Sequence, residues 1–357
     1  MEMLLLLLLA AIGAGSLWAW SAVVQRIRGR QPLLEFTSRD AGPHGLFDLL
    51  LTFLLWTAGQ VVAARVLASV YGVQSGTELE QLPTEAQAAV LVAGSMATIA
   101  ALVVSAIWLG LRYHLTKGAL PNANLIALDL RLGSIAFLLL SPVVYGIQLV
   151  LSQWFKSAHP LIELLQENPS LPFLLVAGFA ALIVAPIGEE YFFRFMLQGW
   201  FERVAEERRL SDSLLWGARR VTADVNSQQE PSPLSSDTAV APATEEGDSD
   251  LRLPSMPGLP RGEALLDSGN PYSPPTLEPE IARLHSSSQA RVPFWPVLVS
   301  SALFALVHYS HGPAPIPLFV FALGLGYLYQ RTHRLLPCIV LHFSLNACSL
   351  LMFLLSL

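Results

Sequence analysis

The sequence predicts an all-α fold, a polytopic membrane bundle of about eight transmembrane helices. Hydrophobic residues make up 53% of the 357 residues, and the mean hydropathy is +0.50. Charged residues make up 13%, against roughly 25% in soluble domains. Long apolar runs recur along the chain, and a helix of about 20 such residues spans a hydrocarbon core. Because lipid offers no hydrogen bonds to the backbone, these runs are expected to be helical.

Eight apolar runs set the expected helices. We place them at 3–24, 46–70, 86–111, 134–155, 171–201, 293–310, 315–330 and 335–356. The first run is similar to a signal peptide, but its basic residues Arg26, Arg28 and Arg30 follow the apolar stretch instead of preceding it. We therefore expect it to be retained as the first transmembrane helix.

The basic residues predict the orientation in the membrane, because Lys and Arg in short loops favour the cytoplasmic side. Of the 21 Lys and Arg residues, 18 fall in loops on one side of the predicted helices, and Lys156 alone falls in a loop on the other. This pattern predicts a plasma-membrane protein with both chain ends outside the cell and with 208–291 in the cytoplasm.

Residues 208–291 differ in composition from the rest of the chain. The segment contains PSPLSSDTAVAPATEEGDSD and is rich in Ser, Pro and acidic residues. Such a chain buries too little apolar area to offset the entropy of ordering, so we expect it to be disordered. It interrupts a membrane core formed by 171–207 and 292–357, which follows the amino-terminal helices of 1–170. The net charge of −6 comes largely from this insertion, and we expect no nucleic-acid partner.

Polar residues inside the predicted helices are functional candidates, because ionisable side chains are costly in lipid. The first group is Glu189, Glu190 and Arg194 in the stretch PIGEEYFFRFM. Glu190 and Arg194 stand four positions apart, on one helix face and within reach of an ion pair. Glu189 is rotated by about 100° from Glu190 and is expected to meet a different neighbour. One glutamate is then neutralised, and the other is left for chemistry.

Two further groups lie on later helices. In FALVH, His308 follows Phe304 by one turn. In HFSLN, His342 and Asn346 project from one helix face, and the asparagine needs a hydrogen-bonding partner in lipid. At a rise of 1.5 Å per residue, both groups reach a depth at which they can meet Glu189 in one cavity.

These motifs carry a resemblance to a known family. EEYFFR fits EExxxR, FALVH fits FxxxH and HFSLN fits HxxxN, in that order on successive helices. The chain resembles the CPBP family of intramembrane proteases, which includes type II CAAX prenyl endopeptidases and bacteriocin-processing enzymes. The resemblance covers about 171–356, and the insertion 208–291 departs from the family pattern. It implies the lipid bilayer and a membrane-associated protein or peptide, such as a lipidated CAAX-like tail, as partners.

The resemblance implies hydrolysis of a peptide bond by an activated water. Such a reaction needs a base, a donor for the oxyanion and a protonated leaving amine. The expected catalytic set is Glu189, His308, His342 and Asn346, supported by Glu190, Arg194 and Phe304. In this set Glu189 is the base, and His308 helps to hold or deprotonate the water. His342 and Asn346 stabilise the oxyanion, while the ion pair orients Glu189 and neutralises charge.

A metal-dependent mechanism is the alternative. Glu189, His308 and His342 could supply three ligands to zinc or another divalent metal, which leaves one position for water. Asn346 would then be the oxyanion donor and Glu190 the base. The HExxH spacing of common metalloproteases is absent from the sequence. At this level the two mechanisms remain alternatives.

Two other classes of function fit the same residues. A proton- or ion-coupled transporter could use Glu189, His308 and His342 as a relay. The internal repeats that are common in transporters are not visible in the sequence. A non-catalytic membrane scaffold would present the segment 208–291 to partners, but the presence of every catalytic-type residue argues against this interpretation.

Overall fold

The computed structural model describes residues 2–35, 42–73, 82–113, 122–155, 165, 170–207, 211–217, 293–309 and 314–356. Within these ranges every element of secondary structure is a helix, which confirms the predicted all-α fold. Of the insertion 208–291, for which we predict disorder, all but 211–217 lies outside the described residues.

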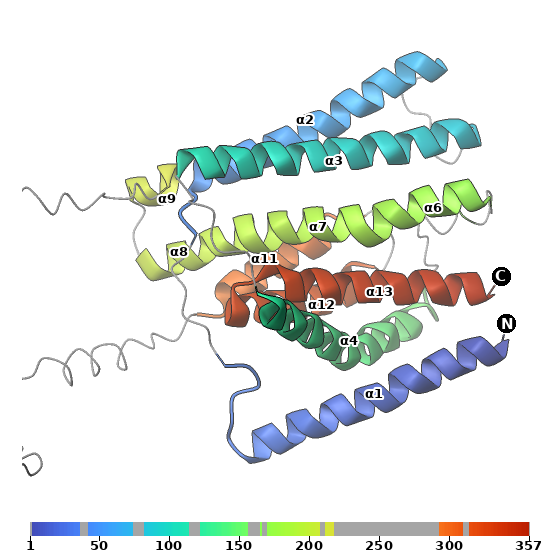
Figure 1. Ribbon diagram of the computed structural model, residues 1–357, viewed down its shortest axis with the longest axis vertical. Helices are drawn as coiled ribbons and strands as arrows, with labels where there is room; N and C mark the ends of the chain where they lie inside the picture. Colours follow the sequence, from blue (N-terminus) through green and yellow to red (C-terminus); the bar gives the residue numbers. More distant parts are fainter. Residues whose placement is uncertain are drawn as a thin grey trace, which may run out of the picture. The chain divides into compact units, whose positions relative to one another are not determined.

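The helices follow one another as α1 (Glu2–Arg28), α2 (Leu46–Tyr71), α3 (Thr84–Arg112), α4 (Ala123–Leu151), α6 (Leu171–Phe179), η2 (Ala180–Val184), α7 (Ala185–Glu190), η3 (Tyr191–Gln198), α8 (Gly199–Glu207), α9 (Asp212–Trp216), α11 (Trp295–Leu306), α12 (Pro315–Thr332) and α13 (Leu335–Ser356). The elements α6 to α8 are continuous and form one long rod (Figure 1). Within this rod, η2 and η3 are π-helical.

Six helical stretches among the described residues are long and apolar enough to cross a membrane: α1, α2, α3, α4, the α6–α8 rod and α13. The predicted spans 293–310 and 315–330 correspond to α11 and α12, which have 12 and 18 residues. At 1.5 Å per residue α11 extends about 18 Å, less than a hydrocarbon core of about 30 Å. The molecule is a polytopic helix bundle, as predicted, but with six candidate spans among the described residues in place of about eight, because neither α11 nor α12 is one of them.

The predicted span starts at position 134, but helix α4 begins earlier. Its first residue is Ala123, and the side chain of Asn122 caps it by accepting a 2.8 Å hydrogen bond from the backbone N–H of Leu125. Arg131, which the predicted orientation counts as a loop residue, therefore lies inside a helix. The nearby Asp129 is tolerated there because Nε of Arg334 lies 2.7 Å from its carboxylate.

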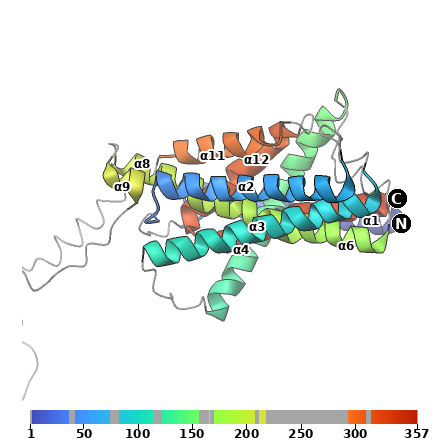
Figure 2. The ribbon, with the colours of Figure 1, turned by 90° about the horizontal axis from the view of Figure 1, so that it is seen from above.

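The helices pack mainly as three pairs, α2 with α3, α4 with α13, and α11 with α12. The α6–α8 rod contacts helices from all three pairs, and Figures 1 and 2 show it running alongside α3 and α13. One apolar cluster joins η3 to α2, α3 and α11 and includes Phe193 and Phe304. Another joins α4, α12 and α13 and includes Phe321 and Leu341. The rod therefore brings side chains from helices far apart in sequence to one place.

Candidate active site

A buried ion pair lies on the rod where α7 meets η3. Nε of Arg194 is 3.1 Å from Oε2 of Glu190, and both side chains are fully buried. The two residues are four positions apart, and the pairing predicted from this spacing is confirmed. Because an unpaired buried ion is strongly destabilising, the pairing explains how both charges are tolerated in a membrane helix.

The imidazole of His342, on α13, lies between two carboxylates. Its Nδ1 is 2.8 Å from Oε1 of Glu190, and its Nε2 is 3.8 Å from Oε2 of Glu189. The ion-paired carboxylate of Glu190 can only accept, which assigns the Nδ1 hydrogen to this bond. As expected, Arg194 pairs with Glu190, while the ion-pair partner of Glu189 is a different residue, His342. The spacing did not predict that the His342 ring also reaches Glu190.

Glu189 is the more accessible of the two carboxylates. Its side chain is 19% exposed, whereas that of Glu190 is 0% exposed. Its Oε2 lies 3.8 Å from Nε2 of His342, whose ring packs against Phe304 as the ring of His308 does. The structure thus places His342 beside Glu189 and His308 on the other contact of Phe304.

His308 lies in the turn after α11, because the helix ends at Leu306. Its Nδ1 is 2.8 Å from the carbonyl oxygen of Phe304. A carbonyl only accepts, so in the neutral ring Nδ1 carries the hydrogen and Nε2 is the acceptor. This tautomer suits a residue that orients or deprotonates a water molecule.

The ring of Phe304 packs against both histidines and the arginine. Its centroid lies 5.0 Å from that of His308 and 6.0 Å from that of His342. Cζ of Arg194 lies 5.4 Å from the same centroid, a distance at which an aromatic face attracts a cation. Phe304 therefore fixes the spacing between the histidines and covers one side of the buried guanidinium.

Asn346 bonds to the backbone of the rod. Its Nδ2 donates a 2.9 Å hydrogen bond to the carbonyl of Ala181. In η2 each N–H bonds five residues back, as the N–H of Ala185 does to the carbonyl of Ala180. The next donor in this series would be residue 186, but Pro186 has no N–H. Asn346 supplies the hydrogen bond that Pro186 cannot make.

The described residues contain no group of three His, Cys, Asp or Glu side chains that could hold a metal ion. Glu189, His308 and His342 are therefore not arranged as the three-ligand set that the metal-dependent alternative needs. These residues do not fit a metal site.

Comparison with known proteins gives one family match. Residues 279–348 match the family model described as "Type II CAAX prenyl endopeptidase Rce1-like". This part of the chain is similar to the Rce1-like family. The match includes His308 and His342, and it confirms the resemblance found in the sequence motifs. At the level of the family, the activity is that of an intramembrane CAAX-type protease acting on membrane-associated proteins. No curated protein and no solved structure matches the chain.

Glu189 and Glu190 lie outside the matched residues, and contacts join them to the matched part of the chain. His342, inside the match, hydrogen-bonds Glu190, and Phe304, also inside it, packs against Arg194. The FxxxH and HxxxN motifs therefore both contact the EExxxR motif and hold it in place.

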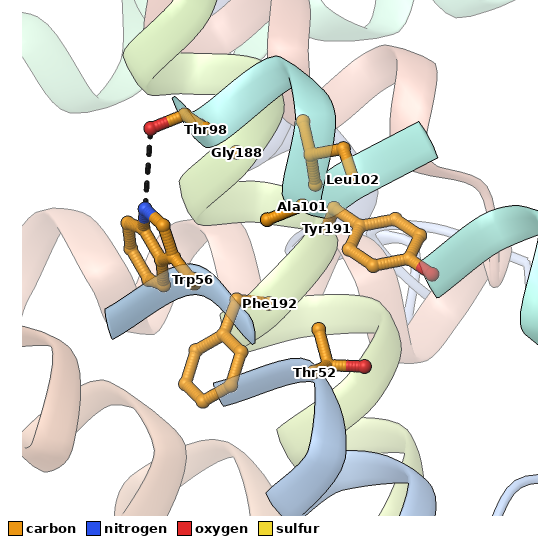
Figure 3. A pocket seen from close by; sticks show the side chains of 8 residues that line it. All are labelled: Thr52, Trp56, Thr98, Ala101, Leu102, Gly188, Tyr191 and Phe192. Carbon is orange, nitrogen blue, oxygen red and sulfur yellow. Dashed lines mark hydrogen bonds between the residues drawn. The ribbon is translucent and has the colours of Figure 1, made fainter. Parts of the chain in front are cut away.

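A pocket lies beside the same part of the rod, between α7, η3 and the pair α2 and α3 (Figure 3). At Thr98 helix α3 lies close to the rod, because a Cβ added to Gly188 would be only 2.9 Å from Cγ2 of that threonine. The hydroxyl of Thr98 accepts hydrogen bonds from Trp56 at 3.2 Å and from Gln60 at 2.9 Å. With this polar group occupied, the pocket offers mainly apolar surface next to the residue that precedes Glu189.

Sequence reasoning missed the continuation of the charged motif along the rod. Gln198 and Glu202 extend the four-residue spacing of Glu190 and Arg194, and all four side chains are buried. We call these four residues the polar stripe. Oε2 of Glu202 lies 3.1 Å from Nε2 of His333, which follows α12. The spacing 190, 194, 198, 202 is visible in the sequence and is the signal that would have revealed the stripe.

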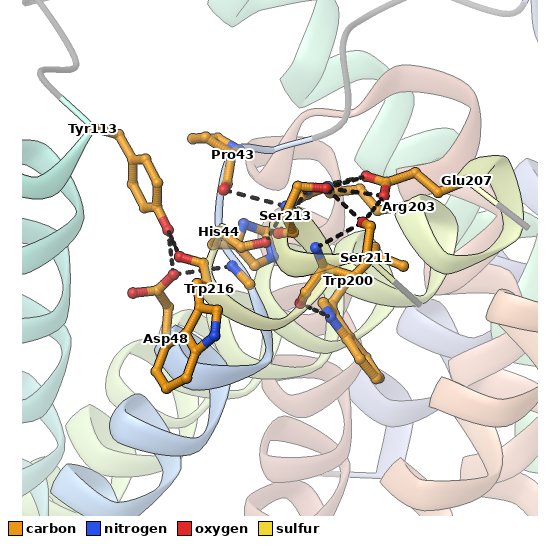
Figure 4. A network of polar contacts seen from close by, with 12 residues as sticks. Pro43, His44, Asp48, Tyr113, Trp200, Arg203, Glu207, Ser211, Ser213 and Trp216 are labelled. Carbon is orange, nitrogen blue, oxygen red and sulfur yellow. Dashed lines mark hydrogen bonds and ion pairs between the residues drawn. The ribbon is translucent and has the colours of Figure 1, made fainter. Parts of the chain in front are cut away.

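Sequence reasoning also missed a polar network at the far end of the rod (Figure 4). Asp48 is fully buried and accepts hydrogen bonds from Tyr113 and from the indole of Trp108, while Nη1 of Arg112 lies 3.4 Å away. Burial, reinforced by the hydrogen bond to this carboxylate, raises the pKa of the Tyr113 hydroxyl. This network ties the end of α3 to the start of α2.

Arg203 of α8 joins the network to the rod. Its Nη1 donates to the carbonyl of His44 at 2.6 Å, and its Nη2 donates to that of Ser213 at 3.0 Å. His44 is itself buried, and Nε2 donates a 3.0 Å hydrogen bond to the carbonyl of Met196. The segment before α2 and the short helix α9 are therefore fastened to the same helix that carries the glutamates.

Proposed function

We propose that the chain is an intramembrane endopeptidase that hydrolyses a peptide bond of a membrane-associated protein with a water activated by Glu189. The observation that carries the proposal is the accessible carboxylate of Glu189 beside a glutamate that Arg194 already neutralises. When His342 is protonated, two carboxylates face two cations, and the buried cluster is neutral overall. The catalytic core consists of 171–207 and 292–357, which supply every one of these side chains.

Water activation uses two residues. Glu189 takes one proton from the water, and Nε2 of His308 accepts a hydrogen bond from the other. The tautomer of His308 set by the Phe304 carbonyl supports this role. The hydroxide oxygen then adds to the carbon of the scissile carbonyl, and the negative charge moves to the carbonyl oxygen.

The oxyanion is stabilised from α13. His342 in its protonated form presents Nε2–H on the side that faces Glu189, and Asn346 retains its second amide hydrogen beside the bond to Ala181. When the C–N bond breaks, Glu189 returns its proton to the departing nitrogen. Glu190, Arg194 and Phe304 touch no reacting atom in this scheme and hold His342 and Glu189 in position.

The proposed substrate is a prenylated, CAAX-like tail held at a membrane. The prenyl specificity in the name of the matched family supports this class. The proposed setting is the plasma membrane, with both chain ends outside and with 208–291 in the cytoplasm. The distribution of Lys and Arg supports this orientation, and labelling of single cysteines in 208–291 before and after permeabilising cells tests it.

The function is tested with purified protein in proteoliposomes. Two peptides with the same CAAX-like sequence, one prenylated and one not, are offered as substrates, and the products are identified by mass spectrometry. We expect cleavage of the prenylated peptide by the wild type and none by Glu189→Gln or His308→Gln. Cleavage retained in both variants would remove the catalytic assignment. A proton flux through the same vesicles without any cleavage would favour the transporter.

A further inference from the structure

The polar stripe runs from the candidate site towards one end of the rod. The side chains of Glu190, Arg194 and Gln198 are 0% exposed, and that of Glu202 is 3% exposed. A row of four buried polar residues is unusual in a membrane helix, where apolar side chains cost nothing to bury. The proposed reaction needs only the first two members, so the other two call for a separate explanation.

Groups on α11 and α12 contact Gln198, in the half of the stripe that is farther from the candidate site. Nε2 of Gln198 donates to the carbonyl of Gly326 and to Oε1 of Glu202, both at 2.9 Å. Oγ of Ser300 lies 3.4 Å from Oε1 of Gln198. These contacts form a continuous polar path from Gln198 to the Glu202–His333 pair.

The path has one gap, between Arg194 and Gln198. Nη1 and Nη2 of Arg194 are buried and make no hydrogen bond to any group in the described part of the chain. Buried N–H groups are nearly always bonded to protein or to ordered water, because leaving them unpaired costs about 1–3 kcal/mol or more. A Cβ added to Gly326 would lie 2.8 Å from Cγ1 of Val297, 3.0 Å from Oε1 of Gln198 and 3.5 Å from Nη1 of Arg194. A donor and an acceptor therefore lie near the same glycine, where a bridging water would satisfy both.

The lower end of the path reaches the aqueous boundary. The side chain of His333 is 12% exposed and stands between α12 and α13, with Arg331 and Arg334 as near neighbours in sequence. Charged side chains gather where helices leave the hydrocarbon region. The path thus begins at the partly exposed His333 and ends at Glu190, whose partner His342 faces Glu189.

We propose that the polar stripe binds a file of ordered water molecules and is the route by which water reaches Glu189 from the aqueous phase. The inference rests on the proposed function, because hydrolysis consumes one water per peptide bond and the surrounding lipid supplies none. In this scheme Gln198 is a positioning residue that joins the water at Arg194 to the Glu202–His333 end.

The test is amide hydrogen exchange of 191–198, followed by mass spectrometry in the full chain in lipid nanodiscs. Gln198→Leu removes the polar link at nearly constant volume, so we expect exchange in this segment to slow several-fold. A purely structural Gln198 predicts the opposite sign, since loss of its bonds to Gly326 and Glu202 would loosen η3 and speed exchange. Faster or unchanged exchange in Gln198→Leu would overturn the proposal.

Two further variants separate the outcomes. Gly326→Ala keeps every side chain of the stripe and places a methyl group 3.5 Å from Nη1 of Arg194 and 2.8 Å from Cγ1 of Val297, and we expect it to slow exchange as well. Gln87→Leu is the matched control, because Gln87 is an equally buried glutamine on α3 and its replacement should leave 191–198 unaffected. The measurement does not need proteolysis. Slowed exchange in a protein that cleaves no peptide would support the water file and overturn the protease assignment alone.

Discussion

His342 donates a 2.8 Å hydrogen bond to the fully buried carboxylate of Glu190. The same carboxylate receives the guanidinium of Arg194 at 3.1 Å. Glu190 is therefore surrounded by two donors and is poorly placed to take a proton from water. Its neighbour Glu189 faces the other ring nitrogen of His342, Nε2, at 3.8 Å, and its side chain is partly exposed. The two adjacent glutamates have different roles, one in stability and one in chemistry.

Substitution of each glutamate by glutamine should separate these roles. We expect Glu189→Gln to abolish cleavage while changing the free energy of unfolding by less than about 1 kcal/mol, because this side chain is partly exposed. Glu190→Gln leaves the buried charge of Arg194 uncompensated and should cost about 3–5 kcal/mol. Both quantities can be measured on one preparation, by peptide cleavage and by unfolding in mixed micelles. Equal destabilisation by the two substitutions would contradict this division.

The bond between Asn346 and the carbonyl of Ala181 makes a second prediction, in the form of a double-mutant cycle. Asn346→Leu leaves that carbonyl without a donor in lipid and should destabilise the protein by about 1–3 kcal/mol. In a Pro186→Ala background residue 186 regains its N–H, which can bond the same carbonyl. The cost of Asn346→Leu should then be clearly smaller, and the coupling between the two sites should be measurable by unfolding. Strictly additive effects would show that Asn346 does not compensate for the proline.

Much of the site was predictable from the sequence because helical spacing is local. The Glu190–Arg194 pair follows from a separation of four residues, and the meeting of Glu189, His308 and His342 follows from depth along successive helices. The sequence indicated that Asn346 needs a hydrogen-bonding partner, but not that this partner is the carbonyl of Ala181, since that bond depends on a π-helical turn that no residue pattern predicts. The reach of one histidine to two glutamates depends on the rotation of α13 against the rod, which spacing within one helix does not define.

Ion pairs between residues on different helices were the other feature that spacing within one helix could not predict. Asp129 lies outside the apolar runs and is predicted to be in a loop. The structure places it in α4, beside its partner Arg334, which lies far away in the sequence. Asp48 likewise depends on Tyr113 and Arg112 from the next helix. Such pairs are set by packing between helices, and one sequence alone contains no record of that packing.

The proposed mechanism uses Glu189 as the base without a metal, which leads to a prediction about metals. The described residues contain no group of three His, Cys, Asp or Glu side chains that could hold one, and we expect cleavage to survive exhaustive dialysis against a chelator. The measurement is the rate of peptide cleavage before and after dialysis, together with the metal content of the protein. Loss of activity with release of one zinc per chain, and its recovery on adding zinc, would contradict this expectation.

His44 predicts how stability depends on pH at the α8 end of the bundle. Burial, which penalises the charged imidazolium, lowers the pKa of His44 to about 4, and the nearby Arg203 acts in the same direction. Above pH 6.5 the ring is neutral in both the folded and the unfolded chain. Between pH 6.5 and pH 4 the unfolded chain takes up the proton first, so the free energy of unfolding falls as pH falls.

The size of this loss follows from the two pKa values. The difference from the ordinary value of 6.5 corresponds to roughly 3 kcal/mol when fully expressed. His44→Gln cannot titrate, yet its amide can still donate to the carbonyl of Met196, so the variant should lose less stability than the wild type between pH 6.5 and pH 4. The difference between the two unfolding curves isolates His44 from the carboxylates that titrate in both proteins. Parallel curves would show that the imidazole is protonated as easily in the folded chain as in the unfolded one.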